Sequence, residues 1–144
     1  MRLFEKRESP DRRYEALEAE YRNFRRRTAA ELEEAHAKAA KETVLPFLDI
    51  YDDLQRALST PCRDEAYCKG IRLIYDNLML TFRSLKIVPM DSKGKIFNPT
   101  YHDAVQCIED KRFRAEEITE VLQVGFLMDD EVIRHAKVIV ANCD

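Results

Sequence analysis

A chain of 144 residues has room for one modest hydrophobic core, or for an extended helix with a small domain attached. Charged residues make up 35% of it and glycines number only three, a balance typical of long solvated helices rather than of a loop-rich enzyme. The net charge of -3 argues against a general nucleic-acid binder, which would carry a basic excess. The sequence contains no run of about eighteen apolar residues, so we expect no membrane span.

The first residues and the cysteines indicate a compartment. Residues 1–6 lack the apolar stretch of a secretory signal, so we expect a cytoplasmic protein. Only Cys62 and Cys68 lie close together in the sequence, and zinc sites usually have tighter pairs. We therefore expect no metal site and reduced thiols at all four cysteines, which are Cys62, Cys68, Cys107 and Cys143.

One long helix is predicted from Ser9 to Leu58. Ser9 can cap it and Pro10 is tolerated at its first position. Its apolar residues recur at steps of three and four and form a narrow stripe, which suits a seam between two helices. The stripe weakens into alanines between residues 29 and 40, where pairing should melt most easily. An isolated helix of this polarity could not bury the stripe, so we expect a homodimer with contacts at Leu17, Tyr21, Phe24 and Leu32.

A helical bundle is predicted next. Pro46 lies inside the helical pattern and predicts a kink or a break there. Apolar residues become denser after it, and a second helix is expected over residues 66–86. One such helix cannot enclose the first, so two copies of the pair should form a dimeric four-helix bundle. The dimer contacts expected in this bundle are Phe47, Leu48, Tyr51 and Leu54.

The pattern changes near residue 88 to turns and short β-rich runs. These runs cover residues 104–108, 119–128 and 131–140, with a hairpin turn expected at Asp129 and Asp130. The predicted fold class is therefore α+β. Its expected domains are a coiled-coil-like helix over 1–43, a bundle segment over 44–87 and a small β domain over 88–144.

The most singular motif lies in this last part. It reads Phe97-Asn98-Pro99-Thr100-Tyr101-His102-Asp103-Ala104-Val105, then Gly125-Phe126, then Arg134-His135-Ala136-Lys137-Val138. It resembles the carboxyl-terminal signature of the GrpE family, the nucleotide exchange factors of the DnaK chaperone. The family form has Asp, Glu, Tyr and Pro where this chain has Asn98, Asp103, Phe126 and His135. The last change removes a residue with a fixed φ angle and is expected to alter strand pairing locally.

The resemblance covers most of the chain and implies a function. It implies a homodimeric exchange factor that binds the ATPase domain of a DnaK-type chaperone and contacts no nucleotide. By the same resemblance, the partner-binding residues are Arg25 and Arg56 on the helix and Leu122 and Val140 in the β domain. Glu131 departs from the family, which often has a basic residue there, so a salt bridge expected at that position would be absent or reversed.

Two functions other than nucleotide exchange are considered for this sequence, a coiled-coil adaptor and a DNA-binding protein. The leading rival is a dimeric coiled-coil adaptor with a β head and no exchange activity, which the fold alone would not separate from an exchange factor. DNA binding by residues 25–27 is disfavoured, because acidic residues lie on both sides of this basic run.

An enzyme is also disfavoured. His102 and Cys107 lack a third group to orient them and an oxyanion site, so we expect neither catalysis nor a cofactor. We expect His102 to make a structural hydrogen bond and Cys107 to pack in the core.

Overall fold

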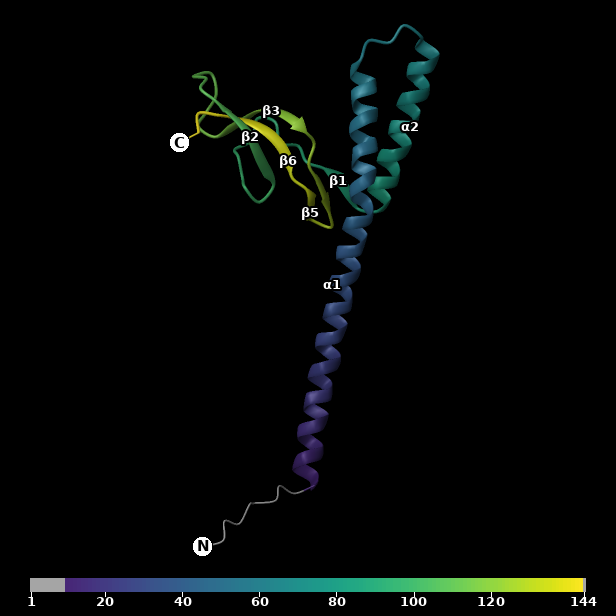
Figure 1. Ribbon diagram of the computed structural model, residues 1–144, viewed down its shortest axis with the longest axis vertical. Coiled ribbons are helices and arrows are strands. Elements are labelled where there is room, and N and C mark those ends of the chain that lie inside the picture. Colours follow the sequence, from purple (N-terminus) through teal and green to yellow (C-terminus); the bar gives the residue numbers. More distant parts are fainter. Residues whose placement is uncertain (1–9, 144) are drawn as a thin grey trace. The chain divides into compact units, whose positions relative to one another are not determined.

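The computed structural model describes residues 10–143, which divide into two compact units, residues 10–40 and residues 41–143 (Figure 1). Two helices and six strands confirm the α+β class. The predicted cap at Ser9 lies outside the described residues. In chain order the elements are α1 (Pro10–Ser59), α2 (Glu65–Ser84), β1 (Ile87–Pro89), β2 (His102–Ile108), β3 (Glu117–Gln123), β4 (Phe126–Met128), β5 (Glu131–Arg134) and β6 (Ala136–Ala141).

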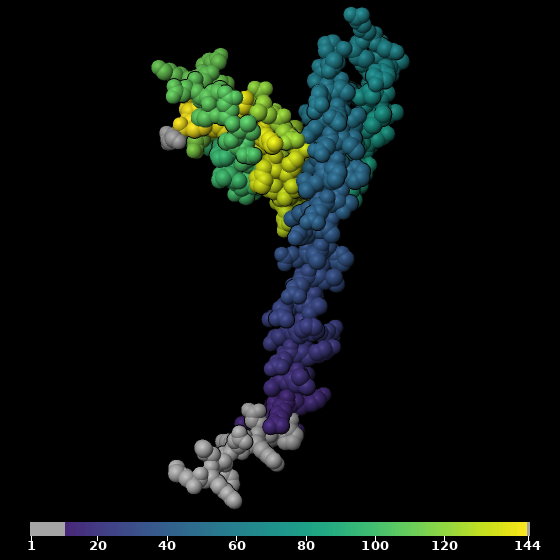
Figure 2. Space-filling view, in the orientation of Figure 1, coloured from purple at the N-terminus to yellow at the C-terminus, as the bar shows by residue number. Residues whose placement is uncertain are grey.

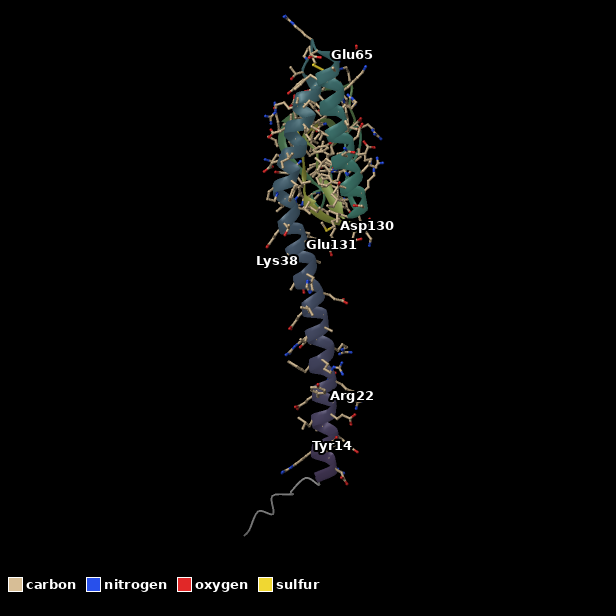
Figure 3. All side chains as sticks on the ribbon, turned by 90° about the vertical axis from the view of Figure 1, so that its right-hand side faces the viewer. Tyr14, Arg22, Lys38, Glu65, Asp130 and Glu131 are labelled. Atoms are coloured by element: carbon tan, nitrogen blue, oxygen red, sulfur yellow. A yellow bond between two sulfur atoms is a disulfide. The ribbon has the colours of Figure 1, made fainter. Side chains whose placement is uncertain are left out.

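The first unit is the N-terminal part of α1. Every side chain from residue 11 to residue 40 is exposed, including the apolar stripe, and Figure 3 shows Tyr14 and Arg22 projecting from the helix. Ion pairs one turn apart, Glu18 with Arg22 and Glu31 with Arg27, each add a few tenths of a kcal/mol, about 0.2–0.5, to such a helix. Most helical stability in proteins comes from packing an apolar face, and this stripe is uncovered within its own unit.

The helices of the second unit form an antiparallel hairpin, in which α2 runs back beside the last part of α1 (Figure 1). The predicted break at Pro46 is wrong, because α1 continues to Ser59. Proline removes one backbone donor there, and the buried side chains of Val44 and Leu48 hold the helix on both sides of it. Asp64 caps α2 by accepting hydrogen bonds from two backbone N–H groups of its first turn, at 3.0 and 3.2 Å.

The β domain contains two three-stranded sheets, and its six strands divide two of the three β-rich runs that the sequence predicts. One has the order β1-β4-β5 and is antiparallel, whereas the other has the order β2-β6-β3 with β2 and β6 parallel. The predicted run 119–128 divides at Val124 and Gly125, and the run 131–140 divides at His135. Both divisions are needed because the halves of each run belong to different sheets. The Asp129–Asp130 turn between β4 and β5 is confirmed, with positive φ at both residues.

The main core lies where the helix hairpin meets the β1-β4-β5 sheet, and Figure 2 shows these parts in direct contact. Phe126 is 0% exposed at its centre. Its ring packs edge-on against Tyr51 at 4.9 Å and against Phe82 at 5.8 Å between centroids. Burial, followed by the hydrogen bond from Tyr75, raises the pKa of Tyr51, so its phenol stays neutral. Leu48 and Tyr51, both expected at a dimer interface, are thus buried within one chain.

A second, smaller core lies under the β2-β6-β3 sheet. Ile118, Val138 and Val140 are fully buried in it, and Phe97 packs against them. The core residues of β6 follow the period of two expected for a sheet with one covered face, whereas β3 has register shifts, so that Ile118 and Val121, three residues apart, both contribute to this core.

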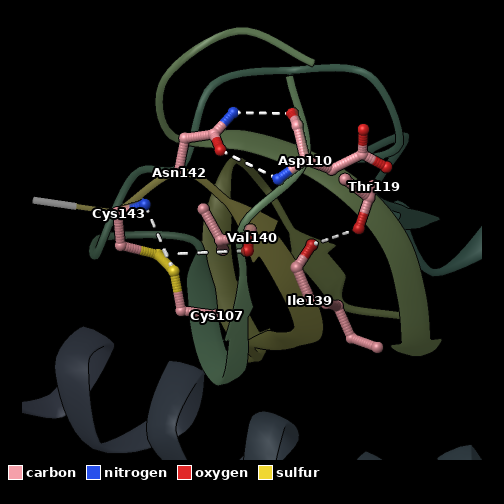
Figure 4. The surroundings of a disulfide bond; sticks show 7 residues. All are labelled: Cys107, Asp110, Thr119, Ile139, Val140, Asn142 and Cys143. Carbon is pink, nitrogen blue, oxygen red and sulfur yellow. Dashed lines mark hydrogen bonds between the residues drawn. A yellow bond between two sulfur atoms is a disulfide. The ribbon is translucent and has the colours of Figure 1, made fainter. Parts of the chain in front are cut away.

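The cysteines form two disulfides, Cys62–Cys68 and Cys107–Cys143, so the expectation of reduced thiols is wrong. Figure 4 shows the second of them. Cys107 also does not pack in the core, because its side chain is exposed on the edge strand β2. Parallel pairing of β2 with β6 brings Cys107 and Cys143 to a Cα–Cα distance of 6.2 Å, within the range that a disulfide bridges. This proximity arises from the sheet and cannot be inferred from sequence spacing.

The expected structural hydrogen bond of His102 is confirmed. Its Nδ1 accepts a hydrogen bond from the backbone N–H of Asn98 at 3.0 Å, while the backbone N–H of His102 donates to the Asn98 carbonyl at 2.8 Å. His102 is 8% exposed. Burial, followed by the positive charge of Lys95, lowers the pKa of its imidazole, so the neutral ring is the form that fits the fold.

Gly125 is the position where a side chain is least tolerated. A Cβ there would lie 2.6 Å from the backbone nitrogen of Ala136 and 2.7 Å from the sulfur of Met90. We predict that Gly125→Ala lowers the free energy of unfolding by about 1–3 kcal/mol through overpacking. Gly70→Ala is the control, since a Cβ on that helical residue meets nothing within 4 Å and should be neutral or stabilising. Urea denaturation measures both, and equal effects would contradict the close approach.

His102 also predicts a pH dependence of stability. Its pKa is lower in the folded protein than in the unfolded chain, so its contribution is present above about pH 6.5 and is lost as the pH falls. The unfolding free energy of wild type should therefore decline between about pH 7.5 and 5 more steeply than that of His102→Gln. His36→Gln, a change on an exposed helical residue, should retain the wild-type slope. A His102→Gln slope equal to that of wild type would contradict this role.

Candidate functional site

A groove with a volume of about 590 Å³ lies between the end of α1 and strand β3. Both walls belong to the second unit. The helix wall comes from the last two turns of α1, and the sheet wall comes from β3 and the residue after it. Its lining consists of Asp52, Gln55, Arg56, Ser59, Glu120, Val121, Leu122, Gln123 and Val124.

The helix wall presents a cation at its centre. The side chain of Arg56 is 76% exposed and forms only a solvated ion pair with Asp53, at 3.3 Å, one turn earlier on α1. Such exposed pairs contribute about 0–1 kcal/mol, so the guanidinium can exchange this partner for another. The hydroxyls of Ser59 and Thr60 donate to the carbonyl of Arg56 and so cap this last turn of the helix.

The sheet wall presents an apolar side chain beside an acidic one. Leu122 is 51% exposed, although leucine is normally buried. Glu120 and Leu122 are the exposed residues of the outer face of β3, because successive side chains of a strand alternate between faces. Between them, Val121 packs against the second core. The groove therefore offers one cation, one anion and one apolar contact.

Arg134, which does not itself line the groove, binds residues of both of its walls. The guanidinium of Arg134 donates to both carboxylate oxygens of Asp52, each at 2.8 Å, and also to the Val124 carbonyl at 2.8 and 3.2 Å. Gln123 donates to the same carboxylate at 2.8 Å. Arg134 is 14% exposed and also lies over the ring of Phe126, with 5.6 Å from its central carbon to the ring centroid.

The four partner-binding residues implied by the resemblance do not all meet. Arg56 and Leu122 lie in the same groove. Arg25 is an exposed residue of the first unit. Val140 is 2% exposed in the second core, so its side chain offers no accessible surface in this state. The sequence did not suggest the polar groove residues Asp52 and Gln123, nor Arg134, which binds Asp52 without lining the groove itself. The sequence did contain one signal for Arg134. It lies inside the mainly apolar run 132–140, and a charged residue in such a run needs a buried partner.

The signature residues mainly build the β domain. Phe97, Ala136 and Val138 contribute to the second core, and Phe126 fills the main one. Asn98 and His102 hold the turn before β2, while Val105 is exposed on that strand. The side chain of Asn98 also accepts a hydrogen bond from the N–H of Thr100, as an Asx turn does. The motif is therefore chiefly a structural one, and within it Arg134 contacts two residues of the groove, Asp52 and Val124.

Glu131 has a partner within the chain. Its carboxylate accepts a hydrogen bond from the ammonium of Lys41 on α1. The family often has a basic residue at this position, and here the acidic residue instead links β5 to α1. Glu131 therefore has an ion-pair partner within the chain.

Two negative findings concern the described residues alone. Within residues 10–143 no group of three or more His, Cys, Asp or Glu side chains could hold a metal ion. In the same range neither helix is long and apolar enough to cross a membrane.

Comparison with known proteins identifies the family. The family model described as GrpE matches residues 1–142. Protein GrpE of Clostridium acetobutylicum is 39% identical over 126 residues, which are 88% of this chain and 62% of that protein. Protein GrpE of Parageobacillus thermoglucosidasius is 33% identical over 135 residues, covering 92% and 60%, and Protein GrpE of Histophilus somni is 36% identical over 129 residues, covering 86% and 66%.

The chain spans about three fifths of the length of the curated relatives it matches, 62% and 60% for the first two. The match nevertheless includes the long helix, the helix hairpin and both sheets, because it extends over residues 1–142. The chain belongs to the GrpE family.

Proposed function

We propose that this protein is a nucleotide exchange factor that binds the ATPase domain of a DnaK-type chaperone and promotes ADP release. Its membership of the GrpE family, with a match over residues 1–142, is the observation that carries this proposal. Under this proposal, the protein is not an enzyme and uses no cofactor. It contacts no nucleotide, nucleic acid or membrane.

The mechanism is differential binding. An exchange factor that binds the open, nucleotide-free ATPase domain more tightly than the closed, ADP-bound one shifts the population toward the open form. Linkage then requires that it weaken ADP binding by the same factor by which ADP weakens its own binding. ATP entry follows, which closes the cycle.

The groove supports this proposal because it presents Arg56 and Leu122 together on one surface. A mobile lobe of an ATPase domain could be held there by a charge contact and an apolar contact at once. We assign Arg56 and Leu122 to the partner contact. Arg25 remains a proposed second contact on the first unit, and we leave Val140 out because its side chain is buried.

We further propose a homodimer through a four-helix bundle. Exposed apolar residues on α1 include Phe47 and Ile50, which directly precede the buried residues Leu48 and Tyr51. On α2, the exposed Ile74 likewise directly precedes Tyr75, which packs against the same core. In two antiparallel helices that face each other, the same rotational offset points to the same side of the pair. The hairpin thus has one uncovered apolar face, which a second copy could cover. The proposed interface comprises Leu17, Tyr21, Phe24, Leu32, Phe47, Leu54 and Ile74.

The domains and the compartment are proposed on the same basis. We propose that residues 1–43 form the paired helix, residues 44–87 the bundle and residues 88–144 the partner-facing β domain. A DnaK-type partner would place the protein in the cytoplasm. Glutathione and thioredoxin keep most thiols reduced there, so the two disulfides would be reversible cross-links in that compartment.

The dimer proposal predicts a mass in solution of twice 16.9 kDa. Ile74→Glu should raise the dimer dissociation constant at least tenfold, because it places an unpaired charge in an apolar interface. Leu80→Glu is the matched control, since Leu80 is an exposed apolar residue on another side of α2, with 62% of its surface exposed against 54% for Ile74. Sedimentation at several concentrations measures both. A monomeric wild type, or equal effects of the two variants, would count against the bundle.

The exchange proposal predicts that this protein accelerates the release of labelled ADP from the DnaK of the same cell, measured by stopped flow. Arg56→Glu should reduce the acceleration about tenfold or more, because the loss of one charge contact costs on the order of 1.4 kcal/mol. Arg63→Glu makes the same charge change in the exposed loop between the helices and should have little effect.

The outcomes separate the candidate functions. If micromolar wild-type dimer does not accelerate ADP release, the exchange proposal is rejected. The dimeric coiled-coil adaptor then remains as the proposed function. Acceleration with equal losses for Arg56→Glu and Arg63→Glu would retain exchange and reject the groove as its contact.

A further inference from the structure

We propose that Arg134 is a positioning residue that sets the width of the groove. Its guanidinium binds α1 through the carboxylate of Asp52 and, at the same time, binds the carbonyl of Val124 just after β3. One rigid group therefore joins the two walls. The part of this proposal that concerns nucleotide exchange rests on the proposed function, whereas the clamp itself does not.

The spacing along each wall makes this clamp relevant to the contact residues. Asp52 lies one helical turn before Arg56, so the two side chains lie on one face of α1. Val124 lies two residues after Leu122, which is one period of an extended chain. Fixing Asp52 against Val124 therefore also fixes Arg56 opposite Leu122.

Arginine is suited to this role in a way that lysine is not. The planar guanidinium presents several N–H groups in a fixed fork, so it can bind a carboxylate with two parallel bonds and still donate to a carbonyl. The ring of Phe126 under the guanidinium and the amide of Gln123 on the carboxylate hold both partners in place. A lysine ammonium is a single point and could serve one wall or the other.

The first measurement tests the clamp on the protein alone. Ketone-bearing unnatural amino acids at Ser59 and Glu120 would carry spin labels across the groove and leave the four cysteines untouched. In Arg134→Lys and in Asp52→Asn we expect the distance distribution between the labels to broaden relative to wild type. Arg114→Gln, which removes the arginine of another ion pair in the β domain, Arg114–Glu117, should leave it unchanged.

Two checks keep this measurement decisive. Circular dichroism at the measuring temperature must show folded protein, so that a broad distribution reports groove width rather than unfolding. An unchanged distribution in folded Arg134→Lys and Asp52→Asn would overturn the clamp.

The second measurement tests the link to exchange. Arg56→Ala should reduce ADP release in the wild-type background, and in the Arg134→Lys background this effect should shrink about threefold or more, as expected for coupled residues. A purely stabilising Arg134 would leave the two mutations additive, and additivity would overturn the link. If wild type fails to accelerate ADP release, the proposed function fails, while the spin-label measurement still decides the clamp.

Discussion

The fold of residues 41–143 depends on the insertion of one aromatic ring, that of Phe126, between two helices and a sheet. The ring contacts Tyr51 of α1 and Phe82 of α2 edge-on, so a residue from the β domain completes the core of the helix hairpin. Ile87, Met128 and Ile133 of the same sheet contribute to this cover of the hairpin. The close approach of Gly125 to Ala136 is what allows the chain to turn from one sheet into the other immediately before this ring.

The ion pair between Arg134 and Asp52, which binds the walls of the groove together, depends on this packing. Phe126 excludes water from one face of the Arg134 guanidinium, and Asp52 then supplies both the charge and the hydrogen bonds that a half-buried cation requires. A buried ion pair of this kind seldom adds much net stability, and removal of one partner costs about 3–5 kcal/mol because the other charge is left unpaired. Its value is geometric, since it allows only one placement of β3 against α1.

The sequence predicted the helices better than the sheets. Periodicity and capping placed both helices within two residues of their observed ends, because those signals are local. The divisions at Gly125 and His135 were not predicted, since they depend on which sheet each segment joins. The Cys107–Cys143 disulfide and the Arg134–Asp52 ion pair were missed for the same reason: the two cysteines meet only through parallel pairing, and Arg134 meets Asp52 across a separation of 82 residues. Family resemblance supplied Arg56 and Leu122, which do lie in one groove, but it did not indicate that the side chain of Val140 is buried.

The order of strands in the second sheet has a consequence for how the chain folds during its synthesis. β6 is the central strand, and both β2 and β3 pair with it rather than with each other. Neither strand can therefore form its ladder until residues 136–141 have left the ribosome. The helices need no such delay, because their hydrogen bonds are local. The nascent chain should thus hold formed helices while the β domain waits, with the residues of its second core open to chaperones until the last strand is inserted.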